Sequence, residues 1–489
     1  MFDYLQLGTG LVDAILAHRL AAAAADLLQL DPAPVYAPCW ASPTHDYART
    51  PRPALVPAKG AFVAAILAAN VHPYLAFRLL HRFFLRLQDS LVEMPGSKHD
   101  LFRARFLPLK DKRLLMRFLA SDRVPRPGQS LAAFLADHAI SSPALHALLA
   151  GLSLAPSVAP QAAPALHRLR TLLAALGLHA PAGLSALPAA LLVAEHAGAS
   201  DWAEAFVRAA ALTGRATQVL GRPVLALAPT SDGWAVRLGP HPAHPHDPHE
   251  LVFAARHLLL AQPLLPLLLP DYVPTLAYTL LRATVILDTP NPVPAPLAHD
   301  TLFVLPHDPL PPTHALVRGP DTNACPPAHR VLYLCTLQEG HSEDPETRLR
   351  PVLDALLALV CGPGEGAGEG KREGEGEREG EGQREGEREA AGEGEGKTAG
   401  EGAGEGEGER EGQRAAPITI HEAVFFAQQV HHPPSPGLLP PNATVVPDWP
   451  ADPEHAGLAA VVEWAARTAA DVAESLIAAR PPSTPAPPE

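Results

Sequence analysis

The sequence has few cysteines, few aromatic residues and no long apolar run. Of 489 residues, 4 are Cys and 5% are aromatic, and the scattered cysteines indicate a reducing compartment rather than a disulfide framework. No uninterrupted apolar stretch reaches the roughly 18 residues of a membrane helix. The N-terminus lacks a basic region followed by a cleavable apolar segment, which argues against secretion. We therefore expect a cytosolic protein that contacts membranes at most transiently.

Basic patches are also absent, although the chain is strongly charged. The net charge is −14, and residues 362–414 alone carry 17 Glu against 8 Lys and Arg, so the remainder is nearly neutral. No Lys/Arg stripe with interleaved aromatic residues occurs, which excludes a nucleic-acid partner. The segment 362–415 is rich in Glu and Gly and, apart from Pro363, has no apolar side chain larger than Ala. It cannot bury enough surface to offset its chain entropy, so we expect a disordered insertion.

A glycine-rich turn lies near the N-terminus, in the stretch LGTGLVDAIL. Gly8 and Gly10 match the first two glycines of a dinucleotide-binding fingerprint, but Asp13 stands where the third glycine is expected. An acidic side chain there adds bulk and negative charge beside a pyrophosphate. Asp31 ends the second expected strand, 21 residues past Gly10, where such folds place a ribose-binding acid. The pattern predicts a βαβ fold that has lost its cofactor.

The periodicity of apolar residues along the rest of the chain predicts two domains. Domain I has an α/β fold of the FAD/NAD-binding (Rossmann-type) class, and an all-helical domain II is inserted into it. Segments such as DKRLLMRFLAS and ALHRLRTLLAALGL have helical period, whereas RPVLALAPT, LRATVILDT and HRVLYLCT are strand-like. The expected boundaries are 1–106 for the first part of domain I, 107–213 for domain II, 214–361 for the second part of domain I, 362–415 for the insertion, 416–479 for the C-terminal part of domain I and 480–489 for a flexible tail.

Catalytic and metal-binding motifs are missing. The run HPAHPHDPHE holds His241, His244, His246 and His249, but its prolines favour an extended loop and no second ligand cluster lies nearby, so we expect no metal site. There is no nucleophile elbow or phosphate-binding loop. The helix DWAEAFVRAAALTG instead places Asp201, Glu204 and Arg208 on one face, with Trp202 and Phe206 turned away. A charge stripe of this kind is also typical of a solvated surface helix.

Four segments resemble the family of Rab escort proteins and Rab GDP-dissociation inhibitors. They are FDYLQLGTGLVDAILA, DPAPVYAPCWAS, KGAFVAAILAANVHPYLAFR and GASDWAEAFVRAAALTGRATQVL. Two further segments resemble the escort branch: EMPGSKHDLFRARFLPLKDKRLLMRFL and DTNACPPAHRVLYLCT. The resemblance covers most of the chain outside 362–415.

The resemblance implies a binding protein without its own chemistry. A Rab escort protein binds GDP-bound Rab GTPases, presents them to the alpha/beta heterodimer of Rab geranylgeranyltransferase, holds the geranylgeranyl lipid of the product and delivers it to membranes. The family's Rab-binding platform corresponds to Tyr36, Asp201, Arg208 and Gln218, and no cofactor is expected. The chain departs from the family at three positions. Ala37 and Pro38 stand where the family has two glycines, and Asp201 stands where the family has the longer side chain of Glu.

Two other functions remain open from the sequence. A Rab GDP-dissociation inhibitor would extract prenylated Rabs without supporting prenylation. A flavin- or nicotinamide-dependent oxidoreductase would use the glycine turn as a cofactor site.

Overall fold

A computed structural model gives the fold. It describes residues 1–41, 47, 50, 52–121, 124–178, 187–195, 199–243, 249–307, 310–338, 343–361 and 418–479. The expected disordered insertion at 362–415 and the expected tail at 480–489 lie outside the described residues.

The first seven-stranded sheet contains the βαβ opening. The turn at Gly8 and Gly10 joins the parallel strands through a helix, as the sequence predicts, and Asp31 ends the second strand. The strand order is β8-β2-β1-β11-β10-β9, with β17 paired in parallel to the end of β11. The strands are β1 (Phe2–Leu7), β2 (Leu27–Asp31), β8 (Ala216–Leu220), β9 (Val224–Thr230), β10 (Gly233–Leu238), β11 (Leu251–Ala261) and β17 (Ala443–Val446).

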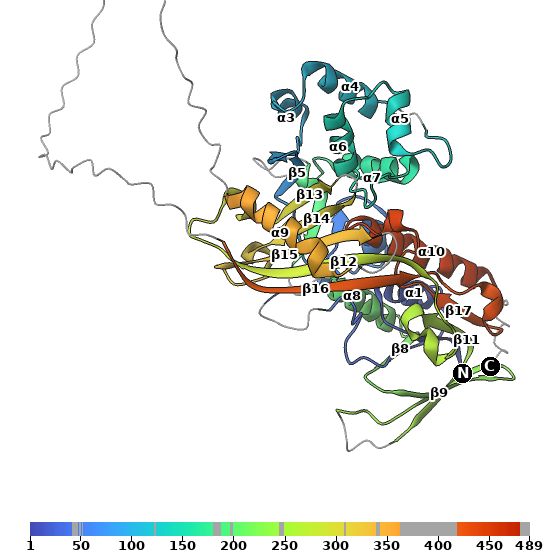
Figure 1. Ribbon diagram of the computed structural model, residues 1–489. Helices are drawn as coiled ribbons and strands as arrows, with labels where there is room; N and C mark the ends of the chain where they lie inside the picture. The colour runs from blue at the N-terminus through green and yellow to red at the C-terminus, as the bar shows by residue number, and fades with distance from the viewer. Residues whose placement is uncertain are drawn as a thin grey trace, which may run out of the picture.

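Three helices pack together beside this sheet. Helix α1 contacts both α8 and α10, although they are far apart in the sequence (Figure 1). Helix α1 is apolar on nearly every side, with Asp13 among its buried residues. The helices are α1 (Leu11–Ala22), α8 (Ala199–Leu212) and α10 (Ala460–Ala479).

A second seven-stranded sheet has the order β16-β12-β15-β14-β13-β5-β6 and is antiparallel except where β5 meets β13. One face is covered by helix α9, whose Leu349, Leu353 and Leu356 join the buried cluster on that face. The elements are β5 (Arg82–Leu87), β6 (Ser90–Glu93), β12 (Leu276–Asp288), β13 (Thr301–His307), β14 (Leu310–Arg318), β15 (His329–Gln338), β16 (Thr419–His431) and α9 (Pro345–Cys361).

The helical region is shorter than the expected domain II. Five helices gather at one end of the molecule, away from α8 (Figure 1). They are α3 (Lys98–Arg103), α4 (Leu109–Leu119), α5 (Leu131–Asp137), α6 (Pro143–Leu152) and α7 (Ala162–Ala175). The expected boundary at 213 therefore differs from the structure, because Trp202 and Phe206 of α8 pack against Phe62 of α2 (Ala61–Ala68). The helical periodicity of the sequence identifies the apolar face of α8 but not the element against which that face packs.

Short elements join these regions. A three-stranded antiparallel sheet has the order β3-β7-β4. Its strands are β3 (Leu55–Pro57), β4 (Phe77–Leu79) and β7 (Leu191–Ala194). Short 3-10 turns lie at His72–Tyr74, Pro188–Ala190, Gln262–Leu267, Ala295–Leu297, Pro320–Thr322, Pro436–Leu438 and Pro453–His455.

Candidate functional site

The glycine turn keeps the backbone shape of a nucleotide-binding fold. Gly8 has φ +124°, and a Cβ there would lie 2.4 Å from the Cβ of Ala261, so only glycine fits. Asp13 is fully buried in the first turn of α1, where its Oδ1 accepts a hydrogen bond of 3.1 Å from Gln6. The carboxylate thus lies at the positive end of the helix dipole, the place that a bound phosphate would take.

Three carboxyl groups surround this turn. A Cβ on Gly10 would lie 3.0 Å from Asp13 Oδ2 and 3.1 Å from Asp448 Oδ1, so both groups lie directly over the turn. Asp31 follows on the neighbouring strand and accepts a 2.6 Å hydrogen bond from Thr9. Burial raises the pKa of Asp13 well above its usual value, and the charges of Asp448 and Asp31 raise it further. Burial also raises the pKa of Asp31.

Side chains from remote segments fill the space in front of the turn. Arg52 forms an ion pair of 2.6 Å with Asp448, and its guanidinium lies over the rings of Trp40 and Trp449. The cavity left at Gly10 measures about 70 Å³, below the roughly 300 Å³ of an ordinary ligand pocket. A neighbouring cavity of about 360 Å³ lies beyond Asp448. The residues present do not fit a dinucleotide, because its pyrophosphate would meet carboxyl groups.

The exposed face of α8 matches the face expected from the sequence. Asp201, Glu204 and Arg208 are exposed, whereas Trp202 and Phe206 are buried. The helix ends at Leu212, and Gly214 follows with φ +73°, as suits a helix C-terminus. This face therefore presents two acidic groups and one basic group to the surroundings.

Tyr36 and Gln218 lie beside α8 in different ways. Tyr36 is half-buried in the loop after β2, and burial together with the nearby carboxylate of Glu204 raises its pKa. Gln218 lies on β8, and its Nε2 donates a 2.8 Å hydrogen bond to the carbonyl of Val207. The structure therefore places Tyr36 close to the charged face, whereas the amide of Gln218 fastens β8 to α8.

Tyr74 is a surface residue that sequence reasoning did not single out. The guanidinium of Arg208 lies 4.6 Å from the centre of its ring, and the Tyr74 side chain is 47% exposed. Tyr74 belongs to the segment NVHPYLAFR, so its place in a family-like motif is the signal that could have found it. The pair gives Arg208 a fixed orientation on the surface.

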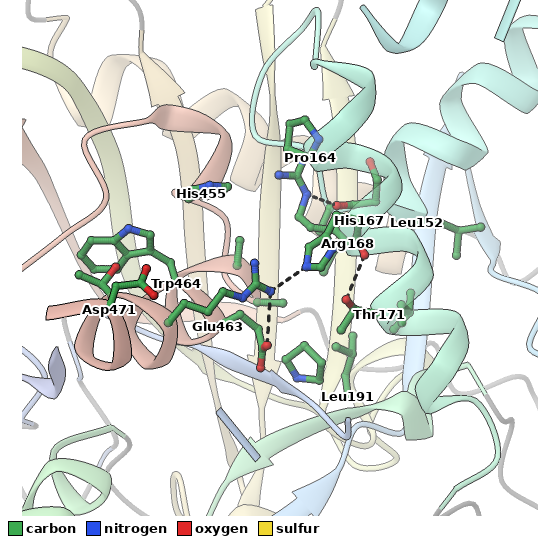
Figure 2. Close-up of a pocket in the computed structure, with 18 residues that line it drawn as sticks. Leu152, Pro164, His167, Arg168, Thr171, Leu191, His455, Glu463, Trp464 and Asp471 are labelled. Atoms are coloured by element: carbon green, nitrogen blue, oxygen red, sulfur yellow. Dashed lines mark hydrogen bonds and ion pairs between the residues drawn. The ribbon is translucent and has the colours of Figure 1, made fainter. Parts of the chain in front are cut away.

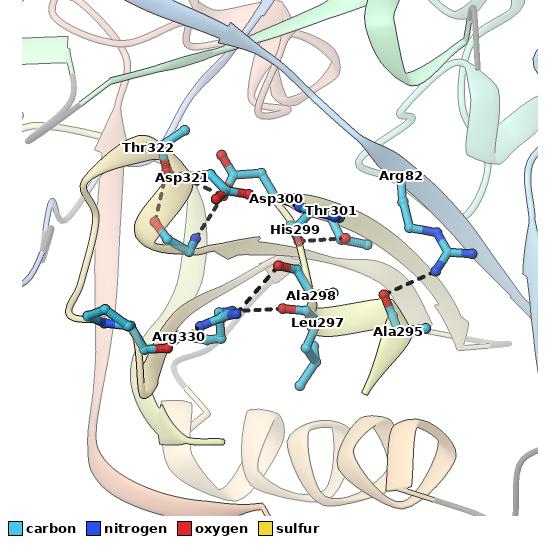
Figure 3. Close-up of polar contacts among 12 residues, drawn as sticks. Arg82, Ala295, Leu297, Ala298, His299, Asp300, Thr301, Asp321, Thr322 and Arg330 are labelled. Atoms are coloured by element: carbon cyan, nitrogen blue, oxygen red, sulfur yellow. Dashed lines mark hydrogen bonds and ion pairs between the residues drawn. The ribbon is translucent and has the colours of Figure 1, made fainter. Parts of the chain in front are cut away.

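The escort-like segment at 321–327 forms a packed turn. Asp300 accepts hydrogen bonds from the backbone of Gly319 and the hydroxyl of Thr322, and Asp321 pairs with His299 at 2.8 Å (Figure 3). Burial raises the pKa of Asp300. The hydrogen bonds to Asp300 Oδ1 hold the turn at 319–322 against the strand that begins at Thr301, so the turn has a structural role.

A further cavity of about 330 Å³ lies between α7 and α10 (Figure 2). Arg467 of α10 donates a 2.7 Å hydrogen bond to His167 of α7 and lies 3.7 Å from Glu463. Glu463 also accepts hydrogen bonds from the backbone of Ala61 and Phe62, the first residues of α2. These contacts fasten the helical region to the C-terminal helix α10, and α10 to α2.

The described part of the chain contains neither a metal-binding cluster nor a membrane-spanning helix. No group of three or more His, Cys, Asp or Glu side chains there could hold a metal ion. His241 and His249 are described, whereas His244 and His246 lie outside the described residues. No helix of the described residues has both the length and the apolar character needed to cross a membrane.

The sequence is similar to two curated proteins, while no protein-family model matches it. Rab proteins geranylgeranyltransferase component A of Saccharomyces cerevisiae is 25% identical over 189 residues, which cover 37% of this chain and 30% of that protein. The protein of the same name in Drosophila melanogaster is 32% identical over 69 residues, 14% of each chain. The chain thus aligns with less than a third of the length of these relatives.

Solved structures share the fold. A Rab GDI from Plasmodium falciparum superposes with a TM-score of 0.55 at 13% identity, over 72% of this chain and 86% of its own. An oxidoreductase from Methanosarcina mazei superposes with a TM-score of 0.54 at 13% identity, over 96% of this chain and 100% of its own. The fold is that of the FAD/NAD-binding α/β proteins. The expected fold class is confirmed, and the curated relatives support the family of Rab escort proteins and Rab GDIs.

Proposed function

We propose that this chain is a Rab escort protein. It binds GDP-bound Rab GTPases, presents them to the Rab geranylgeranyltransferase heterodimer and delivers the lipid-bearing product to membranes. In this role the protein is an accessory component without catalysis of its own, works in the cytosol and contacts membranes transiently. The observation that carries the proposal is the exposed charged face of α8 beside Tyr36.

The α8 face suits a protein partner. Asp201, Glu204 and Arg208 share one side of a helix whose opposite side is fixed by buried aromatic residues. Because the helix is anchored in this way, its exposed charged residues lose little conformational entropy when a partner binds. Such a loss of entropy opposes binding and lowers the affinity of an interface. Tyr36 and Tyr74 add exposed or half-exposed aromatic surface next to these charges. Tyrosine and arginine side chains are enriched among residues that dominate binding energy.

The filled cofactor cleft supports an accessory role. An oxidoreductase of this fold needs room for a pyrophosphate at Gly10, and that position is flanked by Asp13 and Asp448. The observation disfavours the oxidoreductase alternative and leaves the two binding functions. Of these, the escort function is favoured by the two segments at 93–119 and 321–336 that resemble the escort branch.

In vitro prenylation tests the proposal. An unprocessed Rab is incubated with the transferase and geranylgeranyl diphosphate, with and without this chain. We expect transfer to depend on the chain. A protein that extracts prenylated Rab from membranes but does not support transfer would be a Rab GDP-dissociation inhibitor. A protein that does neither and binds no GDP-loaded Rab would contradict the Rab-binding function itself.

A further inference from the structure

The cavity between α7 and α10 is separate from the glycine turn and from the charged face of α8. It measures about 330 Å³, which falls within the roughly 300–1,000 Å³ of small-molecule pockets. None of the described residues that line it belongs to the glycine turn, to the cavity beyond Asp448 or to α8. Its size and position therefore allow a small ligand that is independent of the proposed Rab binding.

The lining of this cavity combines apolar surface with a few polar groups. Leu152 of α6, Leu172 of α7 and Leu191 of β7 supply apolar surface from three different elements. Figure 2 shows His167 of α7 and Trp464 of α10 on opposite sides of the cavity. Mostly apolar walls with a few well-placed polar groups are typical of sites that bind small organic molecules.

Arg467 brings hydrogen-bond donors to the cavity that its neighbours leave free. Its Nη2 donates a 2.7 Å hydrogen bond to Nε2 of His167, and Oε2 of Glu463 lies 3.7 Å from Nη2. The Glu463 carboxylate instead accepts hydrogen bonds from the backbone N–H groups of Ala61 and Phe62. Nε and Nη1 of Arg467 make no hydrogen bond with a described residue, and the side chain is 44% exposed. A guanidinium group has several N–H donors, so Arg467 can bind a further acceptor.

His167 is held in its neutral form and adds one donor. Because arginine can only donate, Nε2 of His167 accepts from Arg467, and the ring proton then lies on Nδ1. This N–H makes no hydrogen bond with a described residue. Burial lowers the pKa of His167, and the basic groups Arg467, Arg168, His455 and Arg170 lower it further. An anion at this pair of residues would therefore meet positive charge and N–H donors from both helices.

The acidic groups of the lining limit the charge that a ligand can carry. The guanidinium of Arg168 is paired with Glu454, whose Oε2 lies 3.2 Å away. Asp471, about one turn beyond Arg467 on α10, is exposed and forms no ion pair with a described residue. Its carboxylate would repel a second negative charge in the cavity. The site therefore suits a ligand with a single negative charge.

We propose that this cavity binds a small organic acid, with its carboxylate on Arg467 and His167 and its apolar body against the leucine side chains of the lining. Carboxylates match the planar fork of a guanidinium and form short, charge-assisted hydrogen bonds with it. The ligand would contact α7 and α10 at the same time. Because it would bind the folded chain and not the unfolded one, its binding should also stabilise the fold.

Calorimetry of the full chain with a matched pair of compounds tests the proposal. Naphthoate carries one carboxylate on a pair of fused aromatic rings, and naphthamide is its uncharged amide. We expect naphthoate to bind at least about tenfold more tightly than naphthamide, because only the carboxylate gains a charge-assisted contact. The melting temperature should rise with the naphthoate concentration. Equal affinity for the two compounds, or no binding of either, would overturn the proposal.

Two variants of the lining change its charge in opposite directions. Arg467→Met removes the cation and keeps a long side chain, so the affinity for naphthoate should fall at least about tenfold. Asp471→Asn removes the opposing carboxylate, so the affinity should rise by about 2- to 5-fold. The affinity for naphthamide should change little in either variant. Well-folded variants that both change the affinity for naphthoate in the same direction would contradict the proposed site.

Two controls separate ligand binding from misfolding. Arg237→Met changes an exposed arginine of β10 outside the cavity and should bind naphthoate like the wild type. Thermal unfolding of each variant shows whether the fold is intact, since the hydrogen bond from Arg467 to His167 joins α7 to α10. If Arg467→Met does not fold, Asp471→Asn still decides, because Asp471 is exposed and its replacement leaves the packing unchanged. A well-folded Asp471→Asn variant that binds naphthoate no more tightly than the wild type would overturn the proposal.

Discussion

The carboxylate of Asp448 lies 2.6 Å from the guanidinium of Arg52, and the pair lies at the glycine turn between β1 and α1. The two residues are separated by 396 positions in the chain. Trp40 and Trp449 face each other with ring centres 5.5 Å apart, and Arg52 lies over both rings. A cluster assembled from remote segments therefore occupies the mouth of the cleft at the glycine turn.

The first prediction is that the purified protein carries neither FAD nor NAD. The phosphate position is flanked by Asp13 and Asp448: the Asp13 side chain takes the space of a pyrophosphate, and the carboxylate of Asp448 would repel it. The measurement is the absorption spectrum, followed by denaturation and chromatography of any released nucleotide. Stoichiometric flavin or nicotinamide in the supernatant would disprove the inference drawn from these two carboxyl groups.

The ion pair itself gives a second prediction. Both side chains are only 12% exposed, so Asp448→Ala leaves the Arg52 charge buried without a partner. We expect a loss of about 3 kcal/mol in the free energy of unfolding. The double variant Arg52→Met with Asp448→Ala should recover part of this loss because no unpaired charge remains. Urea unfolding measures the free energy of unfolding of the single and the double variant. An equal loss of stability in the two variants would show that the ion pair itself contributes little.

Asp13 predicts a dependence of stability on pH. Burial raises its pKa in the folded state, so the folded protein binds this proton more tightly than the unfolded chain does. This contribution to stability is complete below the ordinary pKa of 3.8 and is lost as the pH rises through the raised value. Asp13→Asn cannot ionise and keeps an oxygen for the Gln6 hydrogen bond.

The Asn variant should therefore be more stable than the wild type at neutral pH, by about 1–3 kcal/mol. The difference should shrink as the pH falls toward about 4. Thermal unfolding at a series of pH values measures it. Parallel stability curves for the two proteins would mean that Asp13 does not titrate differently on folding.

Local sequence signals predicted the βαβ opening. Gly8 and Gly10 fix the turn, the apolar period fixes α1, and Asp31 ends β2, all within one short βαβ unit of the chain. The same applies to the exposed face of α8, because helical geometry determines which side chains point together. The helix ends at Leu212, and Arg215 beyond it pairs with Asp26.

Long-range relationships could not be predicted in this way. Nothing in the stretch around Asp448 indicates that it meets Arg52, because the contact depends on how β17 pairs with β11. The assignment of α8 to the helical domain failed for a related reason. The partners of Trp202 are set by the packing of α2 and the three-stranded sheet, not by the helix itself.

Deletion of residues 362–415 is expected to leave the fold nearly unchanged. Val360 of α9 is buried in the same cluster against which Ile418 packs, so a short linker can join the two elements. The cost of closing a loop changes slowly with its length. The melting temperature and the Rab prenylation rate are the measurements. A drop of several degrees, or loss of most activity, would show that the segment has a role of its own.

Arg208 provides the most direct test of the proposed binding surface. If the α8 face is only a solvated surface, Arg208→Glu removes the contact with Tyr74 and costs at most about 1 kcal/mol of stability. If the face meets an acidic or carbonyl-rich surface of a Rab, the reversal replaces a charge-assisted contact with a repulsive one. The cost should then be about 2–5 kcal/mol of binding free energy.

Calorimetry with a GDP-loaded Rab, with the melting temperature measured alongside, separates these outcomes. Arg237→Glu is the matched control, because Arg237 is also an exposed arginine; it pairs with Glu250 on the distant β10–β11 hairpin. We expect the control to bind like the wild type and Arg208→Glu to bind at least tenfold more weakly, since about 1.4 kcal/mol is a factor of ten. Unchanged affinity in a well-folded Arg208→Glu variant would exclude this face as the Rab-binding surface. The fold, and with it the filled cofactor cleft, would remain as described, and the Rab contact would have to lie on another surface.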